Sequence, residues 1–266
     1  MNGRGSGRSN EQSRARDLRD LSHREADMGT TTSAGSDLRT ADAPTTQVQL
    51  AGFSPTEVAA VLADRLLPSR PPQAWGGWRV VSSHRCVNAK ALALLTLETL
   101  VGALRSAGAI ELSMRQRDGV FTSHEAAHLQ LLPGVRPGIF PHQAPEARVI
   151  AWLASRPERG GWLDEAIAGT LIAEESSHPD RTWLHEVHHG LVARRRAREE
   201  TRTILRFIRV RTCHLLPATH ESLGEATDQA IARLLDGRNH LDTHQSRRCH
   251  EAWQRAVWQR RIDNSV

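Results

Sequence analysis

The sequence predicts a mainly α-helical fold, with a single helical domain that carries a short β-hairpin or two and follows a disordered N-terminal tail. Three observations lead to this prediction. Apolar residues recur at helical spacing along much of the chain after residue 50, the stretches that favour strands are short, and the first segment is too polar to fold. We therefore expect a tail over residues 1–50 and one folded domain over residues 51–266.

The N-terminal segment, residues 1–50, is rich in Gly, Ser, Thr, Arg and Asp. Its seven arginines balance its seven acidic residues, so the segment is close to neutral. Such a composition cannot bury enough apolar surface to offset the entropy lost on folding. We interpret it as a solvated leader, with a regulatory tail as the alternative.

Capping residues, prolines and glycines mark where the expected helices begin and end. Ser54, followed by Pro55, caps a helix that runs to Leu66, and Gly108 ends the strongest helix, 89–107. The broad apolar face of 89–107 predicts a central and mostly buried helix. The other expected helices are 124–132, 146–155, 161–174, 181–200, 223–235 and 245–262.

Short runs rich in β-branched and aromatic residues predict a few strands. A turn that begins at Trp75 leads into a short strand that ends near Val81. A hairpin is expected around Arg117-Asp118-Gly119, with strands at 109–112 and 119–121. The run TILRFIRV at 203–210 predicts one more strand.

Charge and cysteine usage limit the class of partner and the compartment. Basic residues number 35 against 30 acidic ones, and the net charge is +5. A basic chain of this kind can bind acidic partners such as phospholipid headgroups or nucleic acid. The three cysteines are far apart and form no C-x-x-C pair, which indicates a reducing compartment without a disulfide framework.

Membrane, targeting and enzyme signals are absent from the sequence. No run of about 18 apolar residues could span a bilayer, and the N-terminus lacks the apolar region of a secretory signal. The patterns G-x-S-x-G, G-x-x-x-x-G-K-[ST] and G-x-G-x-x-G do not occur. We expect a cytoplasmic protein, free or attached at the inner face of the membrane, with no cofactor and no enzymatic activity.

Two stretches match the zinc-protease pattern H-E-x-x-H, in which the histidines bind zinc and the glutamate acts as a base. One match comprises His185, Glu186 and His189, and the other comprises His124, Glu125 and His128. On a helical wheel, His185 and His189 point away from the apolar face of their helix, toward solvent. The second match would lie in the first turns of a short helix. No metal site is therefore expected, and a zinc-dependent hydrolase using either match is the alternative.

Two basic features could contact the phosphate groups of lipids or nucleic acid. Arg194, Arg195 and Arg196 fall in the last turns of the expected helix 181–200, where cations also complement the helix dipole. The last helix, 245–262, combines tryptophans with arginines. That pattern is typical both of membrane-surface helices and of terminal helices packed on a core, and both interpretations stay open.

Several patterns follow one another in a distinctive order: a long apolar helix that ends at a glycine, a short strand, an Ala-Pro loop, a Trp-Leu helix and an apolar hairpin. The segments are LETLVGALRSAGAIEL (97–112), QAP (143–145), GGWLDEAIAG (160–169), HHGLVARRRAREE (188–200) and ILRFIRVRTCHLLPATHESLGEATDQAIARLL (204–235). This order resembles the Golgi phosphoprotein 3 family, in its bacterial, actinobacterial-type form. The likeness covers residues 85–237 and lies in the pattern rather than in one long motif.

The resemblance implies a mostly α-helical domain that binds phosphatidylinositol 4-phosphate at a membrane surface. In that family the headgroup pocket uses one tryptophan and three arginines. Placed by motif, an R-x-x-R pair falls on Arg181 and Leu184, the tryptophan falls near Asn88, and the arginine of the central helix falls on Leu97. Of these four positions, Arg181 alone keeps the family's residue.

The expected function is reversible association with acidic membranes, by a protein that binds phosphatidylinositol 4-phosphate and catalyses no reaction. Arg181 is the expected headgroup-binding residue, and Arg194, Arg195 and Arg196 contribute electrostatically. The apolar hairpin, 203–216, is expected to aid self-association into a homo-oligomer. A nucleic-acid-binding regulator is a third interpretation, disfavoured because the central helix is too apolar to enter a DNA groove.

Overall fold

The computed structural model describes residues 52–71, 76–119, 122–136, 138–172, 178–204, 208–239 and 241–263. The chain divides into two units, 1–43 and 44–266, and all of these residues belong to the second unit. The tail expected over residues 1–50 lies outside the described residues.

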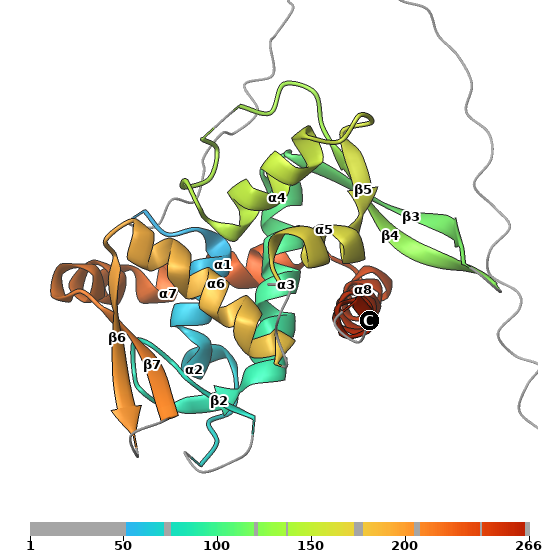
Figure 1. Cartoon of the computed structure of the whole chain (residues 1–266). Helices are drawn as coiled ribbons and strands as arrows, with labels where there is room; N and C mark the ends of the chain where they lie inside the picture. The colour runs from blue at the N-terminus through green and yellow to red at the C-terminus, as the bar shows by residue number, and fades with distance from the viewer. Residues whose placement is uncertain are drawn as a thin grey trace, which may run out of the picture. The chain divides into compact units, whose positions relative to one another are not determined.

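Helices and strands are interspersed along the described residues (Figure 1). The helices are α1 (Pro55–Val61), α2 (Ala63–Leu66), α3 (Ala89–Ser106), α4 (Pro145–Ala154), α5 (Leu163–Thr170), α6 (Pro179–Ala193), α7 (Pro217–Asn239) and α8 (Thr243–Asp263). The strands are β1 (Gly77–Arg79), β2 (Cys86–Asn88), β3 (Ile110–Asp118), β4 (Ser123–Leu131), β5 (Gly160–Trp162), β6 (Ala197–Ile204) and β7 (Ile208–Leu215). Within these residues, no helix combines the length and the apolar character needed to cross a bilayer.

The strands form three small antiparallel sheets within the described residues, β1-β2, β3-β4-β5 and β6-β7. About 52% of the structure is helical and 22% is strand. The fold is therefore mixed α/β, and the prediction of a mainly α-helical domain is wrong. The mostly helical domain implied by the family resemblance is wrong for the same reason.

The sequence-based prediction and the structure differ most at β4, because the sequence predicted a helix over 124–132 and the structure has a strand there. It pairs with β3 along its full length, from Ser123 opposite Asp118 to Leu131 opposite Ile110. Alanine, leucine and glutamate in this segment favour a helix in isolation. Nine paired residues and the burial of residues 126–129 outweigh that local preference.

Helix α6 ends at Ala193, well before the end of the expected helix 181–200. The Arg196 N–H donates to the Leu191 carbonyl at 2.8 Å, and Arg195 adopts the left-handed conformation with φ of 56°. This arrangement is a Schellman-type helix end, with arginine where glycine is usual. No glycine therefore marks the stop in the sequence, and the chain turns directly into β6.

Helix α3 lies at the centre of the core, as its apolar face predicted. Thirteen of its 18 residues are buried, and it contacts α1, α6, α7 and α8 (Figure 1). The buried Trp183 of α6 donates its ring N–H to Thr96 Oγ1 at 2.7 Å, and its ring meets that of Trp253 edge-on at 6.2 Å. These contacts join α3, α6 and α8, so the last helix packs on the core through Trp253.

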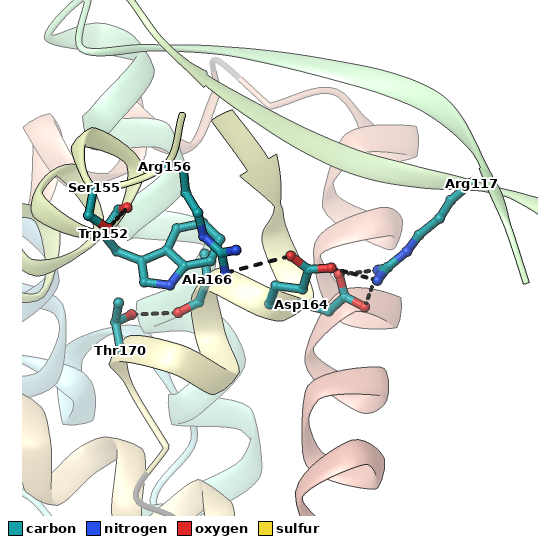
Figure 2. A network of polar contacts seen from close by, with 8 residues as sticks. Arg117, Trp152, Ser155, Arg156, Asp164, Ala166 and Thr170 are labelled. Carbon is teal, nitrogen blue, oxygen red and sulfur yellow. Dashed lines mark hydrogen bonds and ion pairs between the residues drawn. The ribbon is translucent and has the colours of Figure 1, made fainter. Parts of the chain in front are cut away.

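A polar network ties the far end of β3 to α5, as Figure 2 shows. Arg117 donates to Asp164 at 2.8 Å and to Glu165 at 2.7 Å, and its guanidinium lies 5.0 Å from the centre of the Trp162 ring. Both carboxylates lie in the first turn of α5, where negative charge complements the helix dipole. The network therefore holds the β3–β4 hairpin against the helical core.

Candidate functional site

A cavity of about 170 Å³ opens between β1, α6 and the β6–β7 sheet. Five histidines line it, and we call it the histidine pocket: His84, His185, His188, His189 and His214. Its wall also contains Trp78, Arg79, Glu186, Val192, Glu199, Thr212 and Cys213. One water needs about 10–15 Å³ of such space, so the cavity admits a group of several non-hydrogen atoms.

Helix α6 supplies three of the histidines. His185 and His189 are exposed, which confirms the prediction that they point away from the apolar face. His188 is buried, and burial together with the nearby His185 lowers the pKa of His188 to about 3. The His188 side chain is therefore neutral at physiological pH and cannot act as a cation in the pocket.

Trp78 of β1 lies against this helix. Its ring centre is 5.0 Å from that of His185 and 5.2 Å from that of His188. Two buried ring nitrogens in the wall, Trp78 Nε1 and His188 Nε2, have no hydrogen-bond partner among the described residues. Unpaired buried polar atoms cost about 1–3 kcal/mol each. Both nitrogens are buried, so a ligand in the cavity would pair with them only after side chains of the wall shift.

The opposite wall carries the second aromatic pair. His84, held in a left-handed conformation with φ of 58°, lies with its ring centre 5.5 Å from that of His214 on β7. His214 Nε2 is 3.6 Å from a Glu200 carboxylate oxygen. Burial raises the pKa of the neighbouring Cys213 to about 12, so this thiol stays protonated and is a poor nucleophile.

The charged side chains in the wall nearly cancel. Arg79 is exposed, and the carboxylate of Glu186 accepts from Arg148 of α4 at 2.7 Å. With neutral histidines, one arginine and the two glutamates, Glu186 and Glu199, give the wall a formal charge of −1. Protonated histidines are therefore the groups that would make the pocket basic.

The four arginines expected at a headgroup site lie in different environments. Arg181 is exposed in the first turn of α6, four residues before His185, so the two share one helix edge. Arg194 follows the last residue of α6, and its guanidinium is paired with the buried Glu57 and the Gly52 carbonyl. Arg195 is exposed and Arg196 is half-buried.

Arg194 is therefore a structural residue in this fold. Its guanidinium joins α6 to the capping box that Ser54 and Glu57 form at the start of α1. Using it to bind a headgroup would leave the fully buried Glu57 without its cation, which is costly. None of the four expected arginines lines the histidine pocket.

The two zinc-binding patterns differ in geometry. His124 and His128 lie on β4, where four residues span about 13 Å, so they cannot share one zinc ion as a helical pair would. His185 and His189 do lie one turn apart on α6. Among the described residues, however, no three His, Cys, Asp or Glu side chains are grouped so that they could hold a metal ion.

The positions that the resemblance assigns to a headgroup pocket are mostly structural. Asn88 caps α3 by accepting from the Ala91 N–H at 3.0 Å, whereas Leu97 and Leu184 are fully buried. Because α3 is largely buried, it cannot enter a DNA groove as a recognition helix. The sequence did not identify the pocket residues Trp78, Arg79, His84 and His214. Trp78 and Arg79 follow two glycines, which is a weak local signal, and no local pattern marks the two histidines.

Comparison of the chain with protein-family models, with curated proteins and with solved structures finds no match.

Proposed function

We propose that this chain is a non-enzymatic, peripheral membrane protein of the cytoplasm that binds a phosphate-bearing lipid headgroup, such as that of phosphatidylinositol 4-phosphate, in the histidine pocket. The observation that carries the proposal is an open cavity lined by five histidines and the exposed Arg79. Its wall also holds two buried ring nitrogens, Trp78 Nε1 and His188 Nε2, that have no hydrogen-bond partner among the described residues. A ligand that paired them would recover the free energy that their burial costs.

The chemistry of these two nitrogens favours a phosphorylated polyol. Trp78 Nε1–H is a donor only, and a phosphate oxygen is a good acceptor for it. His188 Nε2 donates or accepts according to its tautomer, and a ligand hydroxyl can pair with it in either case. A headgroup with both a phosphate and ring hydroxyls can pair with both nitrogens in either tautomer of His188, whereas an ionised phosphate alone does so only when Nε2 carries the proton.

Individual arginines, rather than the net charge of the wall, support the same ligand class. Arg79 is exposed in the pocket wall and can form a charge-assisted hydrogen bond to phosphate. Arg181 lies one turn before His185 on the same edge of α6 and is exposed, so it could contact a bilayer-bound headgroup from outside the pocket. The resemblance of residues 85–237 to the Golgi phosphoprotein 3 family is a further support, since it implies a lipid ligand.

Vesicle co-sedimentation of the full chain tests the proposal. Three vesicle compositions are compared: neutral, phosphatidylserine-containing and phosphatidylinositol 4-phosphate-containing. We expect preference for the phosphoinositide, and about a tenfold loss of affinity in Arg79→Ala, which corresponds to about 1.4 kcal/mol. Arg136→Ala is the matched control, because Arg136 is exposed and does not line the pocket.

Three further variants separate the proposed contacts. Trp78→Phe keeps most of the ring but removes the Nε1–H, so it should weaken phosphoinositide binding while the fold is retained, as checked by circular dichroism. Arg181→Ala should have a smaller effect than Arg79→Ala, whereas Arg195→Ala should reduce binding to both acidic vesicles alike. Equal affinity of Arg79→Ala and Arg136→Ala for phosphoinositide vesicles would contradict a headgroup site in the histidine pocket.

The sequence also suggested self-association and, as an alternative function, zinc-dependent hydrolysis. Self-association through the hairpin 203–216 stays a prediction, and residues 205–207 at its turn lie outside the described residues. A stoichiometric zinc content, lost in His185→Ala together with hydrolytic activity, would favour the zinc-hydrolase alternative instead of lipid binding.

A further inference from the structure

The charge of the histidine pocket depends on pH. Arg79 is its one arginine, Glu186 and Glu199 are its two carboxylates, and these leave a formal charge of −1 while the histidines are neutral. An anionic headgroup would meet little attraction from such a wall. Histidine ordinarily gains its proton between about pH 5 and 8, so acidification changes the sign of the pocket.

His84 and His214 are the pair whose geometry couples protonation to a ligand. Their ring centres are 5.5 Å apart on opposite segments, the loop after β1 and strand β7. Two protonated imidazoles at this separation repel each other, and an anion that contacts both rings from the cavity offsets that repulsion. Protonating both changes the formal charge of the wall from −1 to +1.

The other titratable and charged groups around this pair come from every neighbouring element. Strand β1 contributes Arg79, and Arg85 follows His84 in the loop after it. Strand β6 contributes Arg198, directly opposite His214, with Glu199 and Glu200, and β7 contributes Cys213, whose pKa burial raises to about 12. Helix α6 contributes His185, Glu186, His188 and His189, with Arg148 of α4 paired to Glu186. A Glu200 carboxylate oxygen lies 3.6 Å from His214 Nε2.

We propose that the histidine pocket takes up its phosphate-bearing ligand together with protons on His84 and His214, so that membrane binding strengthens as pH falls. This inference rests on the proposed headgroup site and adds its regulation. By linkage, a ligand that favours the protonated pair must raise the proton affinity of that pair by the same factor. Each proton taken up on binding makes the affinity rise by up to about tenfold for each pH unit of acidification.

The test is co-sedimentation of the full chain with phosphatidylinositol 4-phosphate vesicles at constant ionic strength, at about pH 7.5, 6.5 and 5.5, across the range in which histidine titrates. We expect the affinity of the wild type to rise by at least about tenfold over this range. The double variant His84→Gln/His214→Gln should lose most of the rise while keeping its folded circular-dichroism spectrum. Soluble inositol phosphate and inorganic phosphate, measured by calorimetry, separate a lipid requirement from phosphate binding alone.

A second double variant controls for the general increase in positive charge on acidification. His142 and His220 are exposed and do not line the pocket, so His142→Gln/His220→Gln should keep the rise of the wild type. The lipid phosphate titrates in the same way with the wild type and with both double variants, so its titration does not affect the difference between these proteins. Calorimetry in buffers of different ionisation enthalpy should also show proton uptake by the wild type and less by His84→Gln/His214→Gln.

Different results would contradict the pH-dependence proposal and the headgroup-site proposal. Binding that does not change with pH, or a rise that survives in His84→Gln/His214→Gln, would overturn this inference and leave the headgroup site standing. Absence of binding at every pH would overturn the proposed function, and this inference with it.

Discussion

His188 is a buried base in the wall of the histidine pocket, and its environment affects how the stability of the protein responds to acid. Burial lowers the pKa of His188 to about 3 in the folded protein. The same side chain in the unfolded chain gains a proton near its ordinary value of 6.5. The stability contributed by neutral His188 is therefore complete above pH 6.5 and is lost progressively as pH falls from 6.5 toward 3.

This difference between the folded and unfolded pKa of His188 predicts that the free energy of unfolding falls in acid because of this one residue. From about pH 7.5 to 5.5, His188 should reduce the free energy of unfolding by about 1.4 kcal/mol. His188→Gln should lack this loss, although it is less stable than the wild type at neutral pH. Urea unfolding at the two pH values measures the difference, and exposed His142→Gln is the control that should behave as the wild type does.

An identical acid-induced loss of stability in His188→Gln and in the wild type would show that His188 accepts a proton without unfolding. That outcome would also weaken the hydrogen-bonding argument for the pocket, because the ring would then be reached by water.

At the scale of elements, Arg117 links the far end of the β3–β4 hairpin to α5 (Figure 2). Arg117 contacts Asp164, whose side chain is 5% exposed, and Glu165, whose side chain is 30% exposed. Arg255 also approaches Asp164, at 3.5 Å. A nearly buried carboxylate needs a cation nearby, whereas an exposed ion pair contributes little.

Arg117→Ala should therefore lower the free energy of unfolding by about 2–3 kcal/mol, less than the full cost of an orphaned buried charge because Arg255 remains. Arg156→Ala is the matched control within the same network. Arg156 is 45% exposed and lies 3.9 Å from Glu165, so its loss should cost less than about 1 kcal/mol. Chemical denaturation of both variants checks the prediction, and equal losses would mean that burial of Asp164 does not matter.

At the scale of the whole described unit, stability should be highest around α3. This helix is largely buried and contacts helices from both ends of the described chain, including α1 and α8. Segments with many buried contacts open only on global unfolding, whereas exposed two-stranded sheets open locally. The core is therefore expected to unfold as one unit around α3.

Hydrogen exchange measured by mass spectrometry tests this prediction. Amides of α3 should exchange last, on the scale of global unfolding, and amides of β1 and β2 should exchange several-fold faster or more, because this sheet has only three residues in each strand. Protection of 123–131 should vanish with that of its partner 110–118 if the two are paired strands. Protection of 123–131 independent of 110–118 would contradict the β-hairpin.

Local signals were sufficient where a segment carries its own caps and its own apolar face. Helices α3, α4 and α8 lie within two residues of their expected bounds, and the exposed positions of His185 and His189 were predicted from the helical wheel. These features depend on contacts between residues a few positions apart, which the sequence displays directly.

The tertiary structure determines the features that depend on contacts between residues far apart in the sequence. Strand β4 forms because β3 pairs with it against its helical preference, and α6 stops at Ala193 because the chain must turn into β6. The histidine pocket joins β1, the loop after it, α6 and the β6–β7 sheet. No local pattern marks His84 and His214 as neighbours, because their proximity is created by packing of segments about 130 positions apart in the chain.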